Sequence, residues 1–317
     1  MDYPLLLYRG ENFNANFTYF SGMDTDHSFL LVWKGRKTLL VPPLNGALAK
    51  KKFRGNAVVY KNPFESLSKI LKGKKVYADL SSLSAKAYVR LKKFCKLQDY
   101  SEELFEIRSR KSEPEVGKLR KAAKLTKELI NSLLISKEMT EKDLRTQLLS
   151  NMTEMGLSPS FEPIVSSGSN TAFPHSSSTK SKVHDFVLVD CGVRYENYCG
   201  DITRCIFLKR NQKVEKKYSD LQEITNAIID ALPDMETGKD VALFAEKQMK
   251  LHKLPKLIHS IGHGVGLNIH EFPRLSHKYE DKIKGRAFTI EPGVYLKSFG
   301  LRFEEMVFFD GKKARIL

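Results

Sequence analysis

Two short stretches decide the fold of this chain: residues 187–192 read VLVDCG, and residues 200–204 read GDITR. In the first stretch an acidic residue ends an apolar run typical of a β-strand, and in the second an acidic residue opens another such run. Asp190 and Asp201 are eleven residues apart, and the polar residues 194–197 between them predict a turn. A hairpin of this length would bring the two carboxylates side by side, where they stay ionised only with a cation between them.

Nearer to the C-terminus, three more polar side chains interrupt apolar stretches. His263 lies within HSIGHGVGLNIHE, residues 259–271, where glycines let the backbone approach closely. Glu291 and Glu304 each stand at the end of, or inside, an apolar β-type run. A carboxylate buried in a strand is costly unless it is paired or bound to a metal. The resulting set has many oxygen ligands and one imidazole, and it suits two divalent ions such as Mn, Co, Fe or Zn: Asp190, Asp201, His263, Glu291 and Glu304.

The rest of the chain divides into two parts with different residue patterns. Residues 1–110 predict a small α/β domain, which includes a hairpin formed by residues 29–33 and 38–41. The stretch from Ser112 to Glu115 is a capping box that starts a helix after this domain, and Thr140, with Asp143 three residues on, marks a second helix start. The remaining residues alternate strand-like runs, the first at residues 161–166, with helices near residues 214–232 and 240–251, so we expect an α+β fold in which helices cover antiparallel strands.

Composition narrows the class of protein. Hydrophobic residues make up 41% and charged residues 28% of the chain, as in globular proteins. The longest apolar runs are strand-sized, the N-terminus lacks a secretory signal, and the four cysteines form no C-x-x-C pair, so we expect a reducing, cytoplasmic setting. The net charge is +16, but the lysines are spread out and accompany no groove-reading motif. A solvated basic surface is therefore favoured over a nucleic-acid site.

These motifs resemble those of the pita-bread metallopeptidases, the group of methionine aminopeptidase, aminopeptidase P and prolidase. The match covers residues 161–317, and residues 107–123 resemble the linker helix of the proline-specific branch. Residues 16–22, NFTYFSG, resemble the creatinase-type N-terminal domain of that branch. The resemblance implies a pita-bread catalytic domain at residues 111–317, preceded by a creatinase-type domain at residues 1–110.

The resemblance also implies how the ligands share the metals. Asp190 would chelate one ion, and Asp201 and Glu304 would bridge two. His263 and Glu291 would hold the second ion. Glu291 is also the residue expected to transfer protons during the reaction.

Four further residues match family positions that contact the substrate or support the site. His175 matches a histidine that helps the leaving group, and His270 matches one that binds the scissile carbonyl. Arg302 matches an arginine that supports the site. Arg274 matches an arginine associated with the free carboxylate of dipeptide substrates, although a surface ion pair explains it equally well. His259 fits either a packing role or support of a metal ligand.

The implied activity is hydrolysis of the peptide bond that precedes proline, by a hydroxide bridging two metal ions. Arg274 and the compact first domain favour a dipeptidase (prolidase) acting on Xaa-Pro. An aminopeptidase P that acts on longer peptides is the nearest alternative. Creatine amidinohydrolase and non-catalytic binding modules of this fold lack the ligand set, which is intact here. The resemblance further implies a homodimer, and the strand-sized apolar runs predict no membrane partner.

Overall fold

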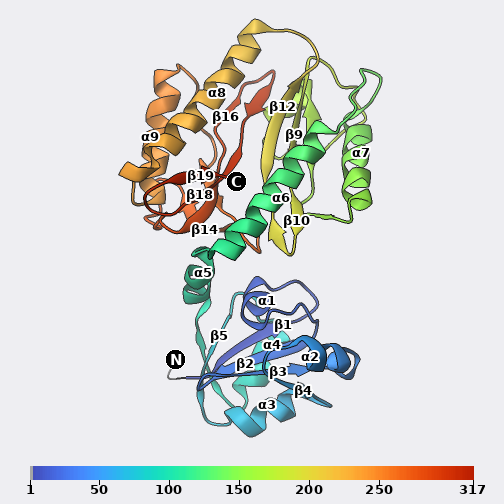
Figure 1. Ribbon diagram of the computed structural model, residues 1–317, viewed down its shortest axis with the longest axis vertical. Coiled ribbons are helices and arrows are strands. Elements are labelled where there is room, and N and C mark those ends of the chain that lie inside the picture. Colours follow the sequence, from blue (N-terminus) through green and yellow to red (C-terminus); the bar gives the residue numbers. More distant parts are fainter. Residues whose placement is uncertain (1–2) are drawn as a thin grey trace. The chain divides into compact units, whose positions relative to one another are not determined.

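In the computed structural model, which describes residues 3–317, the chain divides into two compact units after Arg108 (Figure 1). The N-terminal unit contains a six-stranded mixed sheet with strand order β4-β3-β2-β1-β5-β6. β1, β2 and β3 are antiparallel, whereas β4, β5 and β6 join in parallel. Its elements are β1 (Leu5–Arg9), α1 (Ala15–Ser21), β2 (Ser28–Trp33), β3 (Arg36–Val41), α2 (Gly46–Lys52), β4 (Asn56–Val59), α3 (Pro63–Leu71), β5 (Lys75–Ala78), α4 (Ala85–Lys92), β6 (Lys96–Asp99) and α5 (Ser101–Ser109).

Local sequence explains the two features of this unit that are easiest to predict. The expected hairpin is confirmed as β2 and β3, and Lys34 and Gly35 turn between them with φ of 50° and 73°. Positive φ at both central residues gives the tight turn that matches strand twist. Helix α3 begins at Pro63 because the Asn62 side chain accepts hydrogen bonds from the first-turn amides. The lysine-rich helix α2 was not expected from the sequence.

The C-terminal unit carries four small sheets, with orders β12-β9-β8, β14-β13-β15-β18-β19, β11-β10-β7 and β16-β17. In Figure 1, α8 and α9 lie together on one side of its strands, and α6 and α7 lie on the other. Its elements are α6 (Glu113–Asn131), α7 (Glu141–Glu154), β7 (Ser158–Pro159), β8 (Ile164–Ser167), the 3₁₀ helix η2 (Gly168–Ala172), β9 (Phe186–Cys191), β10 (Val193–Tyr195), β11 (Tyr198–Cys199), β12 (Ile202–Phe207), α8 (Gln212–Ala231), α9 (Gly238–Leu251), β13 (Gly262–Gly264), β14 (Glu271–Leu275), β15 (Arg286–Ile290), β16 (Gly293–Tyr295), β17 (Gly300–Arg302), β18 (Glu305–Phe309) and β19 (Ala314–Ile316).

The two helix starts expected near Ser112 and Thr140 are confirmed. Ser112 and Glu115 form the capping box of α6, and Thr140 and Asp143 form that of α7. Each box satisfies backbone amides that have no partner within the helix. The α+β class is confirmed as well, because antiparallel strands of this unit pack against α8 and α9 around one apolar core.

The expected single hairpin between the two aspartates is wrong in one respect. β10 and β11 leave the sheet of β9 and β12 and pair in a separate sheet with β7. Gly192 and Gly200 permit this switch, since a Cβ on Gly192 would lie 1.7 Å from the Gly200 carbonyl oxygen. A Cβ on Gly200 would lie 2.5 Å from Thr126 Oγ1 of α6. Only glycine allows two backbones and a helix to meet this closely, so the strand breaks just before Asp201.

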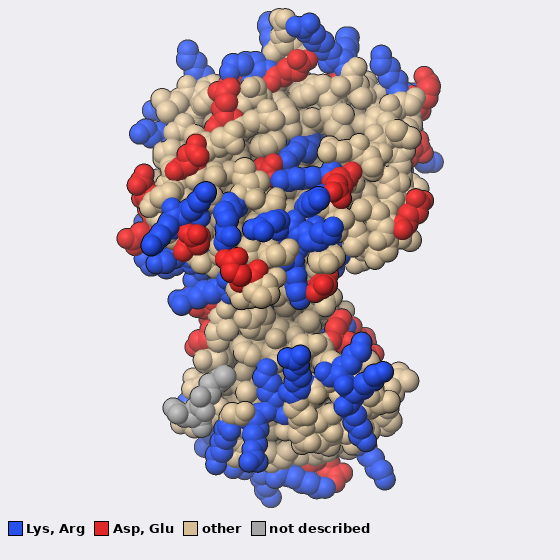
Figure 2. Space-filling model, viewed as in Figure 1, with Lys and Arg blue, Asp and Glu red and all other residues tan. Residues whose placement is uncertain are grey.

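Charge is distributed over the surface. Figure 2 shows Lys and Arg side chains spread across the visible face of both units, with Asp and Glu among them. Residues 1–110 carry 20 Lys and Arg against 10 Asp and Glu. The preference for a solvated surface over a nucleic-acid site stays a prediction. Within residues 3–317, no helix combines the length and apolar character needed to cross a bilayer.

Candidate metal centre

Two sheets of the C-terminal unit deliver the five expected ligands to one cavity. Asp190 lies at the end of β9, and Asp201 directly precedes β12. His263 lies in the middle of β13, Glu291 directly follows β15, and Glu304 directly precedes β18. All five line a cavity of about 770 Å³. Asp190 and His263 lie within paired strands, whereas Asp201, Glu291 and Glu304 lie just outside strand ends, and the two sheets bring all five side chains to the same cavity.

The histidine presents a free lone pair to the carboxylates. His263 Nδ1 lies 3.1 Å from the carbonyl oxygen of Gly264. A carbonyl only accepts, so Nδ1 carries the hydrogen and Nε2 is left as an acceptor. That Nε2 lies 3.5 Å from Asp201 Oδ2 and 3.7 Å from Glu291 Oε1. Burial lowers the pKa of His263 to about 4, so the ring is neutral near pH 7.

The carboxylates lie in surroundings that disfavour their ionised form. Asp201 and Glu304 are almost completely buried, and burial raises the pKa of both well above the usual range, with repulsion from neighbouring carboxylates adding to it. Burial also raises the pKa of Glu291 to about 7. Ligand atoms of Asp201, His263 and Glu304 all lie within 4.8 Å of one another. Anions gathered this closely either hold protons or surround a cation.

Arg302 ties together the side chains behind the ligands. It is buried, its Nη2 donates to Asp190 Oδ2, and its Nε donates to Thr203 Oγ1 at 3.0 Å. The Thr203 hydroxyl in turn donates to Glu304 Oε2 at 2.8 Å. One guanidinium therefore orients two acidic ligands, one directly and one through a hydroxyl, as is common behind metal ligands.

The same arginine leads to a residue that the sequence left without a role. Its Nη1 donates to the Tyr295 hydroxyl at 2.9 Å, and that oxygen lies 3.0 Å from His259 Nε2. His259 Nδ1 lies 2.7 Å from the carbonyl oxygen of Ser260, so Nε2 accepts the tyrosine proton. Tyr295 ends a short β-strand, and nothing in its local sequence distinguishes it from a packing residue. His259 thus supports the site through Tyr295 and Arg302.

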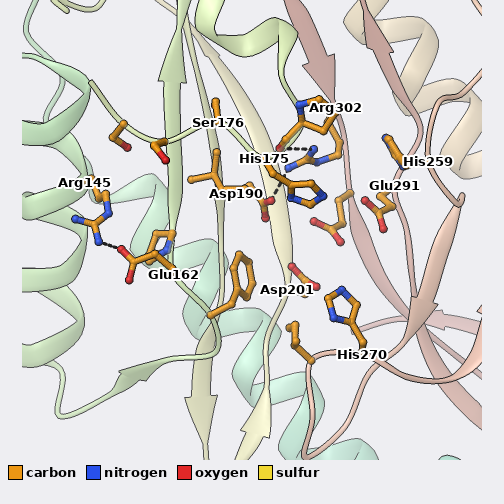
Figure 3. A pocket seen from close by; sticks show the side chains of 18 of the residues that line it. Arg145, Glu162, His175, Ser176, Asp190, Asp201, His259, His270, Glu291 and Arg302 are labelled. Atoms are coloured by element: carbon orange, nitrogen blue, oxygen red, sulfur yellow. Dashed lines mark hydrogen bonds and ion pairs between the residues drawn. The ribbon is translucent and has the colours of Figure 1, made fainter. Parts of the chain in front are cut away.

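Two expected histidines stand at the opening of the cavity. In Figure 3 the carboxylates of Asp190, Asp201 and Glu291 point into one space, and the rings of His175 and His270 lie beside it. His175 and His270 are both solvent-exposed, in contrast to the buried carboxylates. Burial lowers the pKa of His270 and repulsion from His175 adds to the effect. A substrate entering the cavity would therefore meet both imidazoles before the carboxylates.

Arg274 is not brought into this cavity. Its Nε and Nη2 donate to Asp281 at 2.8 and 2.9 Å, and its guanidinium stacks over the Phe272 and Tyr279 rings. It is absent from the residues that line the cavity. The expected contact with a substrate carboxylate finds no support in this arrangement, because the planar fork already holds a carboxylate.

The sequence analysis did not identify the end of the cavity that lies away from the expected ligands. Phe161, Pro163 and Ile164 provide an apolar wall, and Arg145 forms an ion pair with Glu162 there. The strand-like run that begins at Phe161 predicts a strand, but strand periodicity alone does not say which face meets a cavity. These residues define the volume available to a substrate.

The cluster fits divalent metal ions. Asp190 Oδ1 is buried and has no hydrogen-bond partner among residues 3–317. A buried, unpaired carboxylate oxygen is expensive, and so is an imidazole lone pair aimed at carboxylates. A cation bound among these atoms would give a partner both to the unpaired carboxylate oxygen and to the imidazole lone pair. Oxygen-rich donors with one imidazole suit hard or borderline divalent ions.

Comparison with known proteins agrees with this reading of the site. Residues 117–310 match the model of metallopeptidase family M24. An uncharacterized peptidase of Methanocaldococcus jannaschii is 33% identical, covering 92% of this chain and 85% of its own length. An Xaa-Pro dipeptidase of Pyrococcus furiosus is 30% identical, covering 96% of this chain and 90% of its own length.

Solved structures extend the similarity to the whole fold. An X-Pro aminopeptidase from Thermotoga maritima has a TM-score of 0.90 at 26% identity, covering 99% of this chain and 94% of that one. A prolidase from Pyrococcus furiosus has a TM-score of 0.88 at 26% identity, covering 100% and 96%. The family match spans more than half of the chain and contains all five expected ligands. The chain is therefore a peptidase that belongs to metallopeptidase family M24.

Proposed function

We propose that this peptidase hydrolyses the bond preceding proline, with Xaa-Pro dipeptides as its preferred substrates. The observation that carries the proposal is the buried cluster of carboxylates and one neutral imidazole at the base of a cavity flanked by His175 and His270. The relatives named as Xaa-Pro dipeptidases, which align along nearly the whole chain, support the proline preference. A non-catalytic binding module would have no need of this cluster.

We assign Asp190, Asp201, His263, Glu291 and Glu304 to two divalent metal ions. When bound, such ions would polarise the scissile carbonyl and lower the pKa of a water molecule. The chain itself supplies orientation: Arg302 and Thr203 fix two of the carboxylates from behind. Burial of these groups excludes bulk water, which strengthens every electrostatic contact with the substrate.

The two exposed histidines act on the substrate in this proposal. His270 donates a hydrogen bond to the oxygen of the carbonyl that precedes proline, where negative charge develops. The proline nitrogen carries no hydrogen in the peptide bond, so it must gain a proton when the bond breaks. His175 assists that proton's transfer, and Glu291 takes a proton from the attacking water. The acyl residue then leaves with a new carboxylate.

An Xaa-Pro aminopeptidase that acts on longer peptides is the second candidate. Two observations are compatible with action on longer peptides. Arg274 is held by Asp281, so it does not offer its guanidinium to a dipeptide's carboxylate. The cavity of about 770 Å³ also extends past the ligands to Arg145 and Glu162, which leaves room beyond a dipeptide. The reaction is the same in both cases.

One experiment separates these activities. Metal-free protein is reloaded with Mn, Co, Fe or Zn in turn and given Ala-Pro, Ala-Pro-Ala and Ala-Ala. The proposal expects metal-dependent release of alanine from Ala-Pro, with Ala-Ala untouched. Cleavage of the tripeptide alone would replace the dipeptidase with the aminopeptidase. Equal cleavage of Ala-Ala would remove the proline preference altogether. The cytoplasmic location and the homodimer stay predictions from the sequence.

A further inference from the structure

Glu141 is a completely buried acidic residue that the mechanism above does not use. It is the first residue of α7, and its side chain has 0% exposure. The capping box of this helix is formed by Thr140 and Asp143, so the helix start does not need the Glu141 carboxylate. A buried carboxylate is costly unless several donors surround it. The hydrogen-bond donors around the Glu141 carboxylate therefore indicate its role.

Four neutral donors from one segment of the chain converge on this carboxylate. Oε1 accepts from the Ser167 backbone amide at 2.7 Å. Oε2 accepts from Asn170 Nδ2 at 2.8 Å, from the Thr179 amide at 2.7 Å and from the Thr179 hydroxyl at 2.6 Å. Hydrogen bonds to an ionised acceptor are about twice as strong as neutral ones. Together they make Glu141 a strong local anchor.

The donors bracket the segment that carries His175. Asn170 and Thr179 both donate to Glu141 Oε2, so the two ends of residues 170–179 are held at the same oxygen. We call residues 170–179 the His175 loop. A bond from Asn170 Nδ2 to the Ser177 carbonyl oxygen at 3.1 Å tightens the same neck. The neck is buried at Glu141, while His175 at the far end of the loop is exposed.

His175 depends on the path of this loop for its place beside the ligands. Within residues 3–317, its ring makes no hydrogen bond of its own. The loop has further ties of its own: the Ser176 amide donates to the Phe173 carbonyl oxygen at 3.1 Å and Ser178 Oγ donates to the Val165 carbonyl oxygen at 2.8 Å. The bond from Arg302 Nη1 to the Pro174 carbonyl oxygen at 3.4 Å is long. Figure 3 shows the ring extending from the loop toward the side of Asp190 and Glu291. The neck at Glu141 therefore holds both ends of the loop that carries the ring.

We propose that Glu141 is a positioning residue for His175, because its carboxylate closes the neck of the His175 loop and fixes where the imidazole meets the substrate. This inference rests on the proposed function, in which His175 assists the leaving proline nitrogen. Glu141 touches neither substrate nor metal in this account. Its whole effect on turnover passes through the geometry of the loop.

Two substitutions test this role at different strengths. Glu141→Ala removes all four acceptor contacts but leaves the backbone bonds from residues 141 and 142 to Ser181 and Thr179. Glu141→Gln keeps one acceptor oxygen for Asn170 and Thr179 and turns an amide donor toward Ser167, so it preserves the fold with a smaller loss. A misplacement of about 1 Å can cost up to about 10²-fold in rate. We expect kcat/KM for Ala-Pro to fall about 10- to 100-fold in Glu141→Ala, with bound Mn unchanged.

Asp143→Ala is the matched control. Asp143 lies in the same helical turn, and its carboxylate accepts from the Thr140 amide at 2.8 Å and from the Thr140 hydroxyl at 2.7 Å. Removing it weakens the start of α7 without touching the His175 loop. Its kcat/KM should stay near the wild-type value. A loss in Asp143→Ala equal to that in Glu141→Ala would assign the effect to the helix and overturn the proposal.

A double-mutant cycle with His175→Ala tests whether the effect passes through the imidazole. In the His175→Ala background, Glu141→Ala should change the residual kcat/KM by no more than about twofold, the usual scatter of independent sites. The same loss in both backgrounds would mean that Glu141 acts on something else, and the proposal would be wrong.

Hydrogen exchange supplies a readout that does not depend on turnover. In Glu141→Ala, amide exchange in residues 167–181 should rise, and it should not rise in Asp143→Ala. Unchanged exchange, or raised exchange with full activity, would contradict the positioning role. If metal-loaded wild type leaves Ala-Pro intact, the proposed function fails instead, and the exchange comparison still decides whether Glu141 closes the loop.

Discussion

Lys111 Nζ lies 2.7 Å from Glu271 Oε2, and both side chains are buried, with exposed fractions of 1% and 2%. Glu271 directly follows His270, and its other oxygen accepts from the Asn268 amide at 3.0 Å. The pair therefore fixes the backbone on both sides of a histidine that we assign to the substrate. Breaking one member of a buried ion pair leaves an uncompensated charge in the protein interior.

Lys111→Met should lower the free energy of unfolding by about 3–5 kcal/mol, because Glu271 would remain buried without its cation. Chemical denaturation of the metal-free protein measures this directly. Lys118→Met is the control, since Lys118 pairs with Glu196 at 2.9 Å on the surface, with exposed fractions of 38% and 55%. That change should cost no more than about 1 kcal/mol. Equal losses in the two variants would refute the special role of the buried pair.

Arg302→Lys should weaken metal binding by about 10- to 100-fold, the usual effect of disturbing a partner of a metal ligand. A lysine cannot reach Asp190, Thr203 and Tyr295 at once, because it lacks the planar fork. Metal titration of the metal-free protein is the measurement. Arg274→Lys makes the same chemical change outside the cavity and should leave the affinity for the metal unchanged. Unaltered affinity in Arg302→Lys would disprove the supporting role.

Metal binding at pH 6 should release protons. Burial raises the pKa of Glu291 to about 7, so this carboxyl is largely protonated at pH 6 in the metal-free chain, and burial also raises the pKa of Asp201 and Glu304 well above their usual range. His263, with a pKa lowered to about 4, has no proton to give. Titration calorimetry in two buffers of different ionisation enthalpy counts the released protons. The number should fall between pH 6 and pH 8 as Glu291 ionises, and identical heats in both buffers at pH 6 would contradict this.

The sequence predicted that the five expected ligands lie together because their signals are local. An acidic residue at the end of an apolar strand is unusual within a few residues of context, and Asp190 and Glu304 both show this pattern. The capping boxes at Ser112 and Thr140 were predicted for the same reason. The strand break before Asp201 was not, because it depends on Gly200 meeting α6, which lies far away in the sequence.

The partners that support the ligands could not be predicted in this way. Glu141 looks like an ordinary acid in a first helical turn, and its donors lie 26–38 residues further along the chain. Tyr295 contacts Arg302 because β16 and β17 pair. Arg274 is a different case: the sequence left a substrate contact and an ion pair as equal alternatives, and Asp281 holds the guanidinium in an ion pair.

Two neighbouring acids in one strand region offer the most direct test of the metal centre. Glu304 lines the cavity, whereas Glu305 points away and pairs with Lys127 at 2.7 Å and with Arg204. Alternation along a strand places consecutive side chains on opposite faces. The substitution Glu→Gln at each position changes one oxygen to an amide and little else, so the two variants control for each other.

The decisive measurement is bound metal and proline release from Ala-Pro, determined on the same samples of Mn-loaded wild type, Glu304→Gln and Glu305→Gln. We predict that wild type and Glu305→Gln hold metal and release proline, and that Glu304→Gln loses both. Wild type that binds metal but leaves Ala-Pro intact, or Glu304→Gln that releases proline at the wild-type rate, would contradict the assignment of this cavity as a proline-specific metallopeptidase site.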